Sequence, residues 1–294
     1  MKKYSIQLLL AVLAGLLSCT ALNAQSRHEF SFFAGGGLSD LKYDASAGKQ
    51  KMDFGGQVGL GYQYFFCRNL GLGTGAEIAL YNSVFNMDNL STRYTTADMT
   101  GDNFEFRSTV SNYEEKQNAM LLQIPLMLQF QYGGKHKFYI AAGGKAGIPL
   151  SGKYKSSSAS IVNTGYYDYE NYEYTTPEFM GFGTFTNKNA KGDLDFKTAF
   201  FASAEIGMKW RLSDKLSLYT GAYLDYGLND IRKVETRHVT SLQFVEYNTA
   251  NPRDFAINSI VNSQYSRNGN MQSFTDKIIP MAAGIKLRLI FLRR

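Results

Sequence analysis

The chain alternates apolar and polar residues at every second position over eight segments. In the last of them, "AAGIKLRLIFLRR", Leu287 and Leu289 share one face of a strand, and Lys286 and Arg288 share the other. A helix, with 3.6 residues per turn, would spread these charges over several faces. The pattern therefore predicts strands at residues 29–38, 52–66, 70–81, 121–132, 138–150, 198–212, 216–230 and 279–294.

The lengths of these segments and of their connections favour lipid over a soluble core as the medium around the apolar face. The segments run to roughly 10–15 residues, whereas soluble strands centre on about 5–6 and tilted membrane strands need about 9–11. Short connections alternate with long ones at residues 39–51, 83–118, 151–197 and 229–276. Short turns on one rim and long loops on the other are typical of bacterial outer-membrane barrels.

Aromatic residues on the apolar face gather beside the short connections. They form a predicted aromatic belt of Tyr62, Tyr64, Phe130, Tyr132, Phe138, Trp210 and Phe291. Such rings favour the depth of the lipid headgroups. We therefore expect an all-β fold, an eight-stranded antiparallel transmembrane β-barrel with short periplasmic turns, long extracellular loops and both termini in the periplasm. We expect the barrel to lie in the outer membrane of a Gram-negative cell and to contact its lipid.

The first 24 residues have the three parts of a secretory signal peptide. Lys2 and Lys3 precede an apolar run at 8–17, and small residues follow, so we expect cleavage between Ala24 and Gln25. The run is shorter than the ~20 residues of a spanning helix. Lipidation at Cys19 is an alternative. The predicted mature chain, 25–294, forms a single domain.

Charge and motifs exclude several classes of function. The net charge of +6 is spread along the chain, which does not indicate nucleic-acid binding. "GIPLSGKY" lacks the Ser or Thr of a phosphate-binding loop, and "GLGTGA" lies inside a strand, so we expect no cofactor. We also expect no metal, since Cys19 lies in the predicted leader and Cys67, the one cysteine left in the mature chain, cannot build a thiolate zinc site alone.

Histidine chemistry is sparse. Of His28, His136 and His238, only His238 has a hydroxyl two residues on, in "RHVT", and no carboxylate partner is evident. The sequence therefore predicts no catalytic residues and no enzyme; a lipid-modifying enzyme at the membrane interface is the less favoured alternative.

Charged residues on the polar face collect at similar distances from the predicted periplasmic ends of their strands. They are Glu77, Lys145, Glu205, Asp225, Lys286 and Arg288. An eight-stranded barrel is only wide enough for side chains to fill, and unpaired charges there are costly. We interpret the six residues as a charge network that fills the lumen; a narrow channel for ions or small solutes lined by the same residues is the alternative.

The long connections are the other candidate site. Residues 151–197 contain a stretch rich in Tyr, Asn and Gly, "NTGYYDYENYEY". Tyr gives a large contact area at low entropic cost, so loops 83–118, 151–197 and 229–276 suit binding of an extracellular glycan or protein. The alternative is that they only keep the surface soluble. The sequence thus favours a membrane scaffold or surface binding protein.

Several short stretches resemble the PorT-like outer-membrane barrels of Bacteroidota. They are "NAQ" at the leader's end, "LLQIPLMLQFQY", "FYIAAGGKAG" and "AYLDYGLNDI". The resemblance implies an eight-stranded outer-membrane barrel, and it adds a secretion-associated role as a further alternative.

Overall fold

The computed structural model describes residues 28–213, 216–233, 243–267 and 270–292. The predicted signal peptide with Ala24 and Gln25, and His238, lie outside these residues. The side chain of Phe291 is also outside the description, although its backbone pairs with Phe30.

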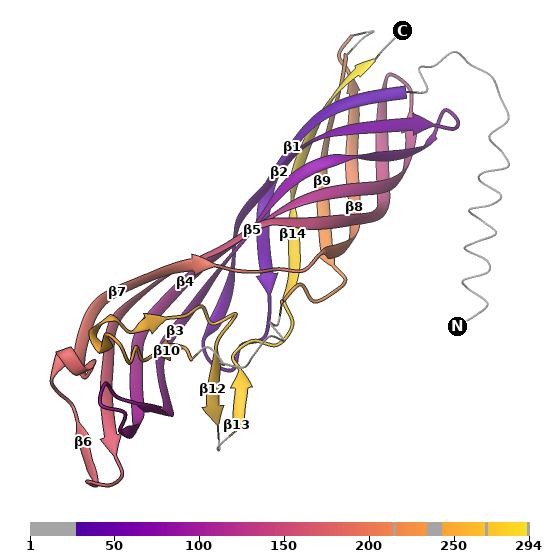
Figure 1. Ribbon diagram of the computed structural model, residues 1–294. Coiled ribbons are helices and arrows are strands. Elements are labelled where there is room, and N and C mark those ends of the chain that lie inside the picture. Colours follow the sequence, from indigo (N-terminus) through magenta and orange to yellow (C-terminus); the bar gives the residue numbers. More distant parts are fainter. Residues whose placement is uncertain (1–27, 214–215, 234–242, 268–269, 293–294) are drawn as a thin grey trace.

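Eight long antiparallel strands close into a ring (Figure 1). In ring order they are β1 (His28–Lys42), β2 (Lys49–Phe65), β3 (Leu70–Ala97), β4 (Asn103–Gly133), β5 (His136–Tyr167), β8 (Ala199–Arg211), β9 (Leu216–Gly227) and β14 (Ile279–Leu292), which pairs with β1. Their burial alternates residue by residue, so one face of each strand lines the ring and the other faces out. The predicted eight-stranded antiparallel fold is confirmed.

Large apolar side chains cover the outside of the ring. Examples are Leu60, Leu126, Ile206 and Leu287, each exposed although apolar. The inside is crowded: a Cβ on Gly59 would lie 2.7 Å from Cβ of Glu77 and 2.4 Å from a backbone oxygen. Glycine at such a position leaves room for large inward side chains on neighbouring strands.

Two of the predicted loops are wrong, because their residues continue the barrel strands. β3, β4 and β5 are 28, 31 and 32 residues long, and residues 83–118 form the far halves of β3 and β4 with a tight turn at 98–102. Residues 151–197 continue β5 and then form β6 (Tyr172–Tyr174), the 3-10 helix η1 (Glu178–Met180) and β7 (Gly183–Asp193). The backbone groups of these polar residues are hydrogen-bonded across neighbouring strands. A search for alternating apolar residues does not detect such strands.

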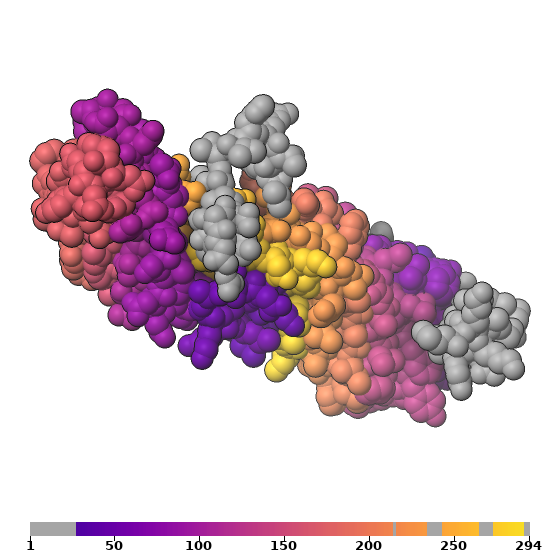
Figure 2. Space-filling model, turned by 90° about the horizontal axis from the view of Figure 1, so that it is seen from below, coloured from indigo at the N-terminus to yellow at the C-terminus, as the bar shows by residue number. Residues whose placement is uncertain are grey.

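Together these strands form a distal extension beyond the ring. We define it as the parts of β3, β4 and β5 that continue past the last pairing of β3 with β2, at Asn86, and of β5 with β8, at Gly147, together with β6 and β7. β5 leaves β8 at Gly147 and pairs with β7 from Lys153 onward. Figures 1 and 2 show an elongated molecule with the barrel at one end and the extension at the other. The shorter connection predicted at 39–51 is reduced to residues 43–48.

The face that is buried changes along the extension at one row of residues. In β4, Tyr113 and Glu115 are buried at odd positions, but Phe106 and Val110 are buried at even ones. Asn112 lies between them with a φ of 50°. Asn187 of β7, with a φ of 51°, occupies the same row on the far side of β5. Asn tolerates this left-handed conformation better than most residues.

The predicted loop 229–276 packs against the extension. Its described parts form β10 (Val245–Glu246), the 3-10 helix η2 (Pro252–Asp254), β11 (Ala256–Ile257), β12 (Gln264–Arg267) and β13 (Asn270–Ser273). Phe244 packs edge-on against Tyr113 with ring centroids 5.0 Å apart, and Tyr247 contacts Phe106 at 5.2 Å. The extension therefore has an aromatic core, which is continuous with Tyr81 and Phe201 at the adjoining end of the lumen.

Candidate functional site

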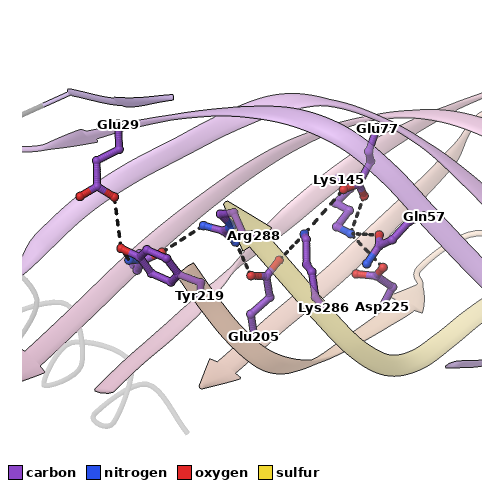
Figure 3. Close-up of polar contacts among 10 residues, drawn as sticks. Glu29, Gln57, Glu77, Lys145, Glu205, Tyr219, Asp225, Lys286 and Arg288 are labelled. Atoms are coloured by element: carbon purple, nitrogen blue, oxygen red, sulfur yellow. Dashed lines mark hydrogen bonds and ion pairs between the residues drawn. The ribbon is translucent and has the colours of Figure 1, made fainter. Parts of the chain in front are cut away.

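The end of the lumen network farther from the short turns is centred on Lys145 of β5. Its Nζ donates to Glu77 Oε1 at 2.6 Å and to Asp225 Oδ2 at 2.8 Å, and lies 3.4 Å from Gln57 Oε1 (Figure 3). Glu77 comes from β3 and Asp225 from β9, and neither strand is a neighbour of β5 in the ring. One ammonium thus joins three separate parts of the barrel wall.

A second group of charges follows toward the short turns. Lys286 Nζ donates to Glu205 Oε1 at 2.6 Å and lies 3.7 Å from Glu77 Oε2. Arg288 Nη2 donates to Glu205 Oε2 at 2.5 Å, and Arg288 Nη1 contacts Gln129 at 3.4 Å. Figure 3 shows the two groups as one chain of contacts that shares Glu77.

A third group near the short turns was not anticipated from the sequence. Lys209 forms an ion pair with Glu29, and Tyr219 donates to the same carboxylate at 3.2 Å. Gln129 Nε2 donates to the Tyr219 hydroxyl at 3.3 Å and connects this group to Arg288. The signal for it was present, since Glu29 and Lys209 occupy inward positions of their strands, but both lie close to strand ends.

All six residues expected in the lumen thus lie in one network, three acids against three bases. Five of them, Glu77, Lys145, Glu205, Asp225 and Lys286, are at most 5% exposed. On the side of the network that faces the extension, Gln123 donates to the Tyr81 hydroxyl at 2.8 Å, and the Tyr81 ring stacks on Phe201 with ring centroids 5.6 Å apart. Chemically the six charges sum to zero, and each carboxylate accepts a hydrogen bond from a base, while Glu77 Oε2 and Asp225 Oδ1 have no hydrogen-bond partner among the described residues.

The residues expected in the aromatic belt, apart from Phe291 with its undescribed side chain, lie on the outer face beside the short turns. Tyr132, Phe130 and Phe138 are exposed, and the Trp210 ring packs against His136 at 5.2 Å. Tyr62 accepts or donates a hydrogen bond at 2.7 Å with His28 Nδ1, and its ring contacts Phe30 at 5.1 Å. Tyr64 packs edge-on against Phe66 at 5.3 Å. Their role at a lipid interface remains a prediction.

A buried carboxylate attaches the described parts of residues 229–276, which we call the covering segment, to the extension. Glu115 of β4 accepts hydrogen bonds from Tyr113 at 2.5 Å and Gln117 at 2.7 Å, and from the Ser259 hydroxyl at 2.6 Å and the Ile260 amide at 3.1 Å. Burial raises the pKa of Glu115, and the four hydrogen bonds oppose that rise. Sequence reasoning missed this residue because it lies inside a predicted loop.

The tip of the extension combines ordered and exposed aromatic rings. Tyr167 stacks on Phe104 at 5.1 Å and donates to Asp98 Oδ2 at 2.9 Å. Tyr169, Tyr172 and Phe179 project into solvent, with 68%, 58% and 66% exposure. The predicted Tyr-rich recognition segment is therefore a structured hairpin with exposed rings at its end.

The remaining expectations concern chemistry. Within the described residues, no group of His, Cys, Asp and Glu is arranged to hold a metal ion, and no helix there is long and apolar enough to cross a membrane. His28 and His136 contact aromatic rings on the outer face. The expectation that the protein is not an enzyme and needs no cofactor stays a prediction.

Comparison with solved structures gives distant matches over most of the chain. The Neisserial surface protein NspA is 8% identical with a TM-score of 0.34, covering 91% of this chain and 98% of NspA. Ail of Yersinia pestis is 13% identical with a TM-score of 0.31, covering 90% and 99%. The N-terminal barrel of Pseudomonas aeruginosa OprF is 11% identical with a TM-score of 0.29, covering 91% and 98%.

Sequence comparison is more decisive. No curated protein sequence matches the chain. A family model described as "Outer membrane protein beta-barrel domain" matches residues 23–233, which is more than half of the chain. It supports the outer membrane as the location and does not distinguish the PorT-like group, which stays a prediction. The chain belongs to the outer membrane protein β-barrel domain family.

Proposed function

We propose that the protein is a non-conducting outer-membrane anchor that carries a rigid binding surface outside the cell. The observation on which the proposal rests is the continuity of β3, β4 and β5, which pass from the barrel wall into the extension without leaving the sheet. Flexible loops would suffice to keep a surface soluble. A hydrogen-bonded extension whose aromatic core continues into the barrel favours presentation of a surface in a fixed position.

The lumen supports an anchor better than a channel. The charges at the centre of the lumen are paired with one another, although the buried Lys137 near the short turns has no hydrogen-bond partner among the described residues, and the ring of eight strands is narrow. An open path would require charged groups that face water and ions instead. We take Glu77, Lys145, Glu205, Asp225, Lys286 and Arg288 as a network that fills the lumen and fixes the strand register.

The binding surface is assigned to the tip of the extension. Exposed aromatic rings are enriched at sites that bind proteins and sugars, because they bury large area at low entropic cost. Tyr169, Tyr172 and Phe179 are the residues proposed to contact an extracellular glycan or protein. In this orientation both termini and the short turns face the periplasm. A role in secretion is not part of the proposal, because no contact in the described residues favours it.

Ion conductance in a planar bilayer tests the anchor. The wild type is compared with the double variant Glu77→Gln, Lys286→Met, which removes one acid and one base from the network. We expect no steady wild-type current. A reproducible wild-type current that the double variant alters would overturn the proposal in favour of a channel.

Labelling of intact cells tests the orientation. In a Cys67→Ser background, the Tyr172→Cys variant carries a thiol at the tip, and a membrane-impermeant maleimide should react with it without cell lysis. Lys135→Cys in the turn between β4 and β5 is the matched control, because Lys135 is also solvent-exposed but lies on the opposite rim. Labelling of the Lys135→Cys variant and not of the Tyr172→Cys variant in intact cells would reverse the proposed orientation.

A further inference from the structure

Lysines line up across the outer face of the sheet just beyond the apolar surface of the barrel. Lys116 of β4 lies directly opposite Lys155 of β5, which lies directly opposite Lys191 of β7. On the other side of Lys116, Val84 of β3 separates it from Lys51 of β2. We name these four exposed residues, Lys51, Lys116, Lys155 and Lys191, the lysine row.

The row is unfavourable in the protein alone. Cβ atoms of directly opposite residues lie about 4.5–5.5 Å apart, and like charges in such pairs destabilise a sheet. Among the described residues, Lys116 is the member of the row that has an ion pair, with Glu114 at 3.7 Å. The flanking Lys153 lies directly opposite Asp193 in the register, so an opposite charge stands across from it, whereas Lys116, Lys155 and Lys191 lie opposite one another. Three adjacent lysines with one weak carboxylate partner leave a local excess of positive charge.

The height of the row suits lipid headgroups. The outward apolar residues end at Met120 on β4 and at Leu150 on β5. Lys116 is four residues beyond Met120, about 13 Å along a strand and about 10 Å in height once strand tilt is included. Headgroup regions extend about 5–8 Å beyond the hydrocarbon core on each side. The flexible lysine stem brings the ammonium group back into that region.

We propose that the lysine row binds the phosphate groups of anionic lipid headgroups in the leaflet around the extension end of the barrel. The row continues the lipid-facing side of the wall, which favours a lipid over a soluble polyanion as the occupant. An ammonium group suits a phosphate as a point charge. The inference rests on the membrane position of the barrel and does not depend on what the tip of the extension binds.

The test compares two charge-matched double variants in vesicles of phosphatidylcholine. Lys155→Gln, Lys191→Gln removes two members of the row. The control, Arg68→Gln, Lys135→Gln, removes two positive charges from the opposite rim. Diphosphorylated lipid A is added as the probe, its dephosphorylated form serves as the second arm, and soluble hexametaphosphate as the third. Native mass spectrometry of the extracted protein counts the bound lipid A.

Each lysine near an anionic surface contributes about a fivefold preference, so the row variant should bind lipid A roughly 25-fold more weakly than wild type. The control variant should bind lipid A as strongly as wild type does. Dephosphorylated lipid A should bind to wild type and to both variants equally. Without lipid A, the row variant should unfold at a denaturant concentration equal to or above that of wild type, because repulsion is removed; this shows that it folds.

Two results would overturn the proposal. One is equal binding of lipid A by the row variant and wild type, or an equal loss in the control variant. The other is binding of hexametaphosphate that depends on Lys155 and Lys191 while lipid A does not bind, which would assign the row to a soluble polyanion.

Discussion

Lys145 and Glu77 are joined by an ion pair of 2.6 Å across the lumen, although a whole strand separates them along the wall. Lys145 is also paired with Asp225, two strands away on the other side. The ammonium therefore pairs with two buried carboxylates whose strands are not hydrogen-bonded to each other. Loss of this single base leaves two acids without their main partner.

Lys145→Met should destabilise the barrel by about 3–5 kcal/mol, the cost of leaving a buried charge without its partner. The measurement is denaturant unfolding of the protein in vesicles, followed by fluorescence of Trp210, the single tryptophan. Lys135→Met is the matched control on an exposed turn and should change stability by less than ~0.5 kcal/mol.

Neutralising one partner tests the cause. The double variant Lys145→Met, Asp225→Asn should recover most of the loss, because Glu77 and Glu205 then balance Lys286 and Arg288, and Glu77 keeps Lys286 at 3.7 Å. If Lys145→Met unfolds at the same denaturant concentration as Lys135→Met, the network does not stabilise the barrel.

Glu115→Ala should release the covering segment from the extension. The change leaves the Ser259 hydroxyl and the Ile260 amide without their acceptor, and each unsatisfied buried group costs about 1–3 kcal/mol. Hydrogen exchange at the Ile260 amide should accelerate, while amides of β4 in the barrel wall keep their protection. Unchanged exchange at Ile260 would mean that aromatic packing alone holds the segment.

The same carboxyl predicts a pH dependence of the covering segment. The pKa of Glu115 is raised above its ordinary value of 4.5 by burial, so the carboxyl ionises at lower pH when exposed than when packed. Its contribution to stability is fully present below pH 4.5 and is lost as the pH rises through the raised pKa. The free energy of opening at Ile260, corrected for intrinsic exchange rates, should fall over that range. Glu115→Gln should abolish the dependence, and persistence of it in that variant would assign it to another group.

Asn112 should tolerate Gly but not Val. With a φ of 50°, a β-branched residue at this position costs roughly 1–2 kcal/mol, whereas Gly adopts the conformation freely. Thr109→Val, at a regular position of the same strand, is the control and should be nearly neutral. Denaturant unfolding of the three variants gives the comparison; equal midpoints for Asn112→Val and Asn112→Gly would show that the residue can leave this conformation without loss.

Alternation along the chain sufficed to predict the eight barrel strands and the inward positions of Glu77, Lys145 and Lys286. Both follow from a membrane environment, which separates the two faces of each strand sharply. The same reasoning failed in the extension, because the buried face changes at Asn112 and the periodicity of β4 is interrupted there. Both faces of that region also carry many polar residues, so the pattern resembles a loop.

Contacts between distant segments were equally inaccessible to periodicity. Glu115 is satisfied by Ser259 and Ile260, more than 140 residues away, and nothing local to "NYEEKQN" indicates that one of its two adjacent glutamates is buried. The same holds for the lysine row, which depends on the register between β4, β5 and β7.

The passage of β3, β4 and β5 from the wall into the extension also has a mechanical consequence. Backbone hydrogen bonds run through the junction, so the tip is a lever fixed to the barrel and not a tethered domain. Pulling on Tyr172 would load the strands of the barrel in shear along their length. A partner on a second surface would then be held at a set distance and angle from the membrane, with little slack in between.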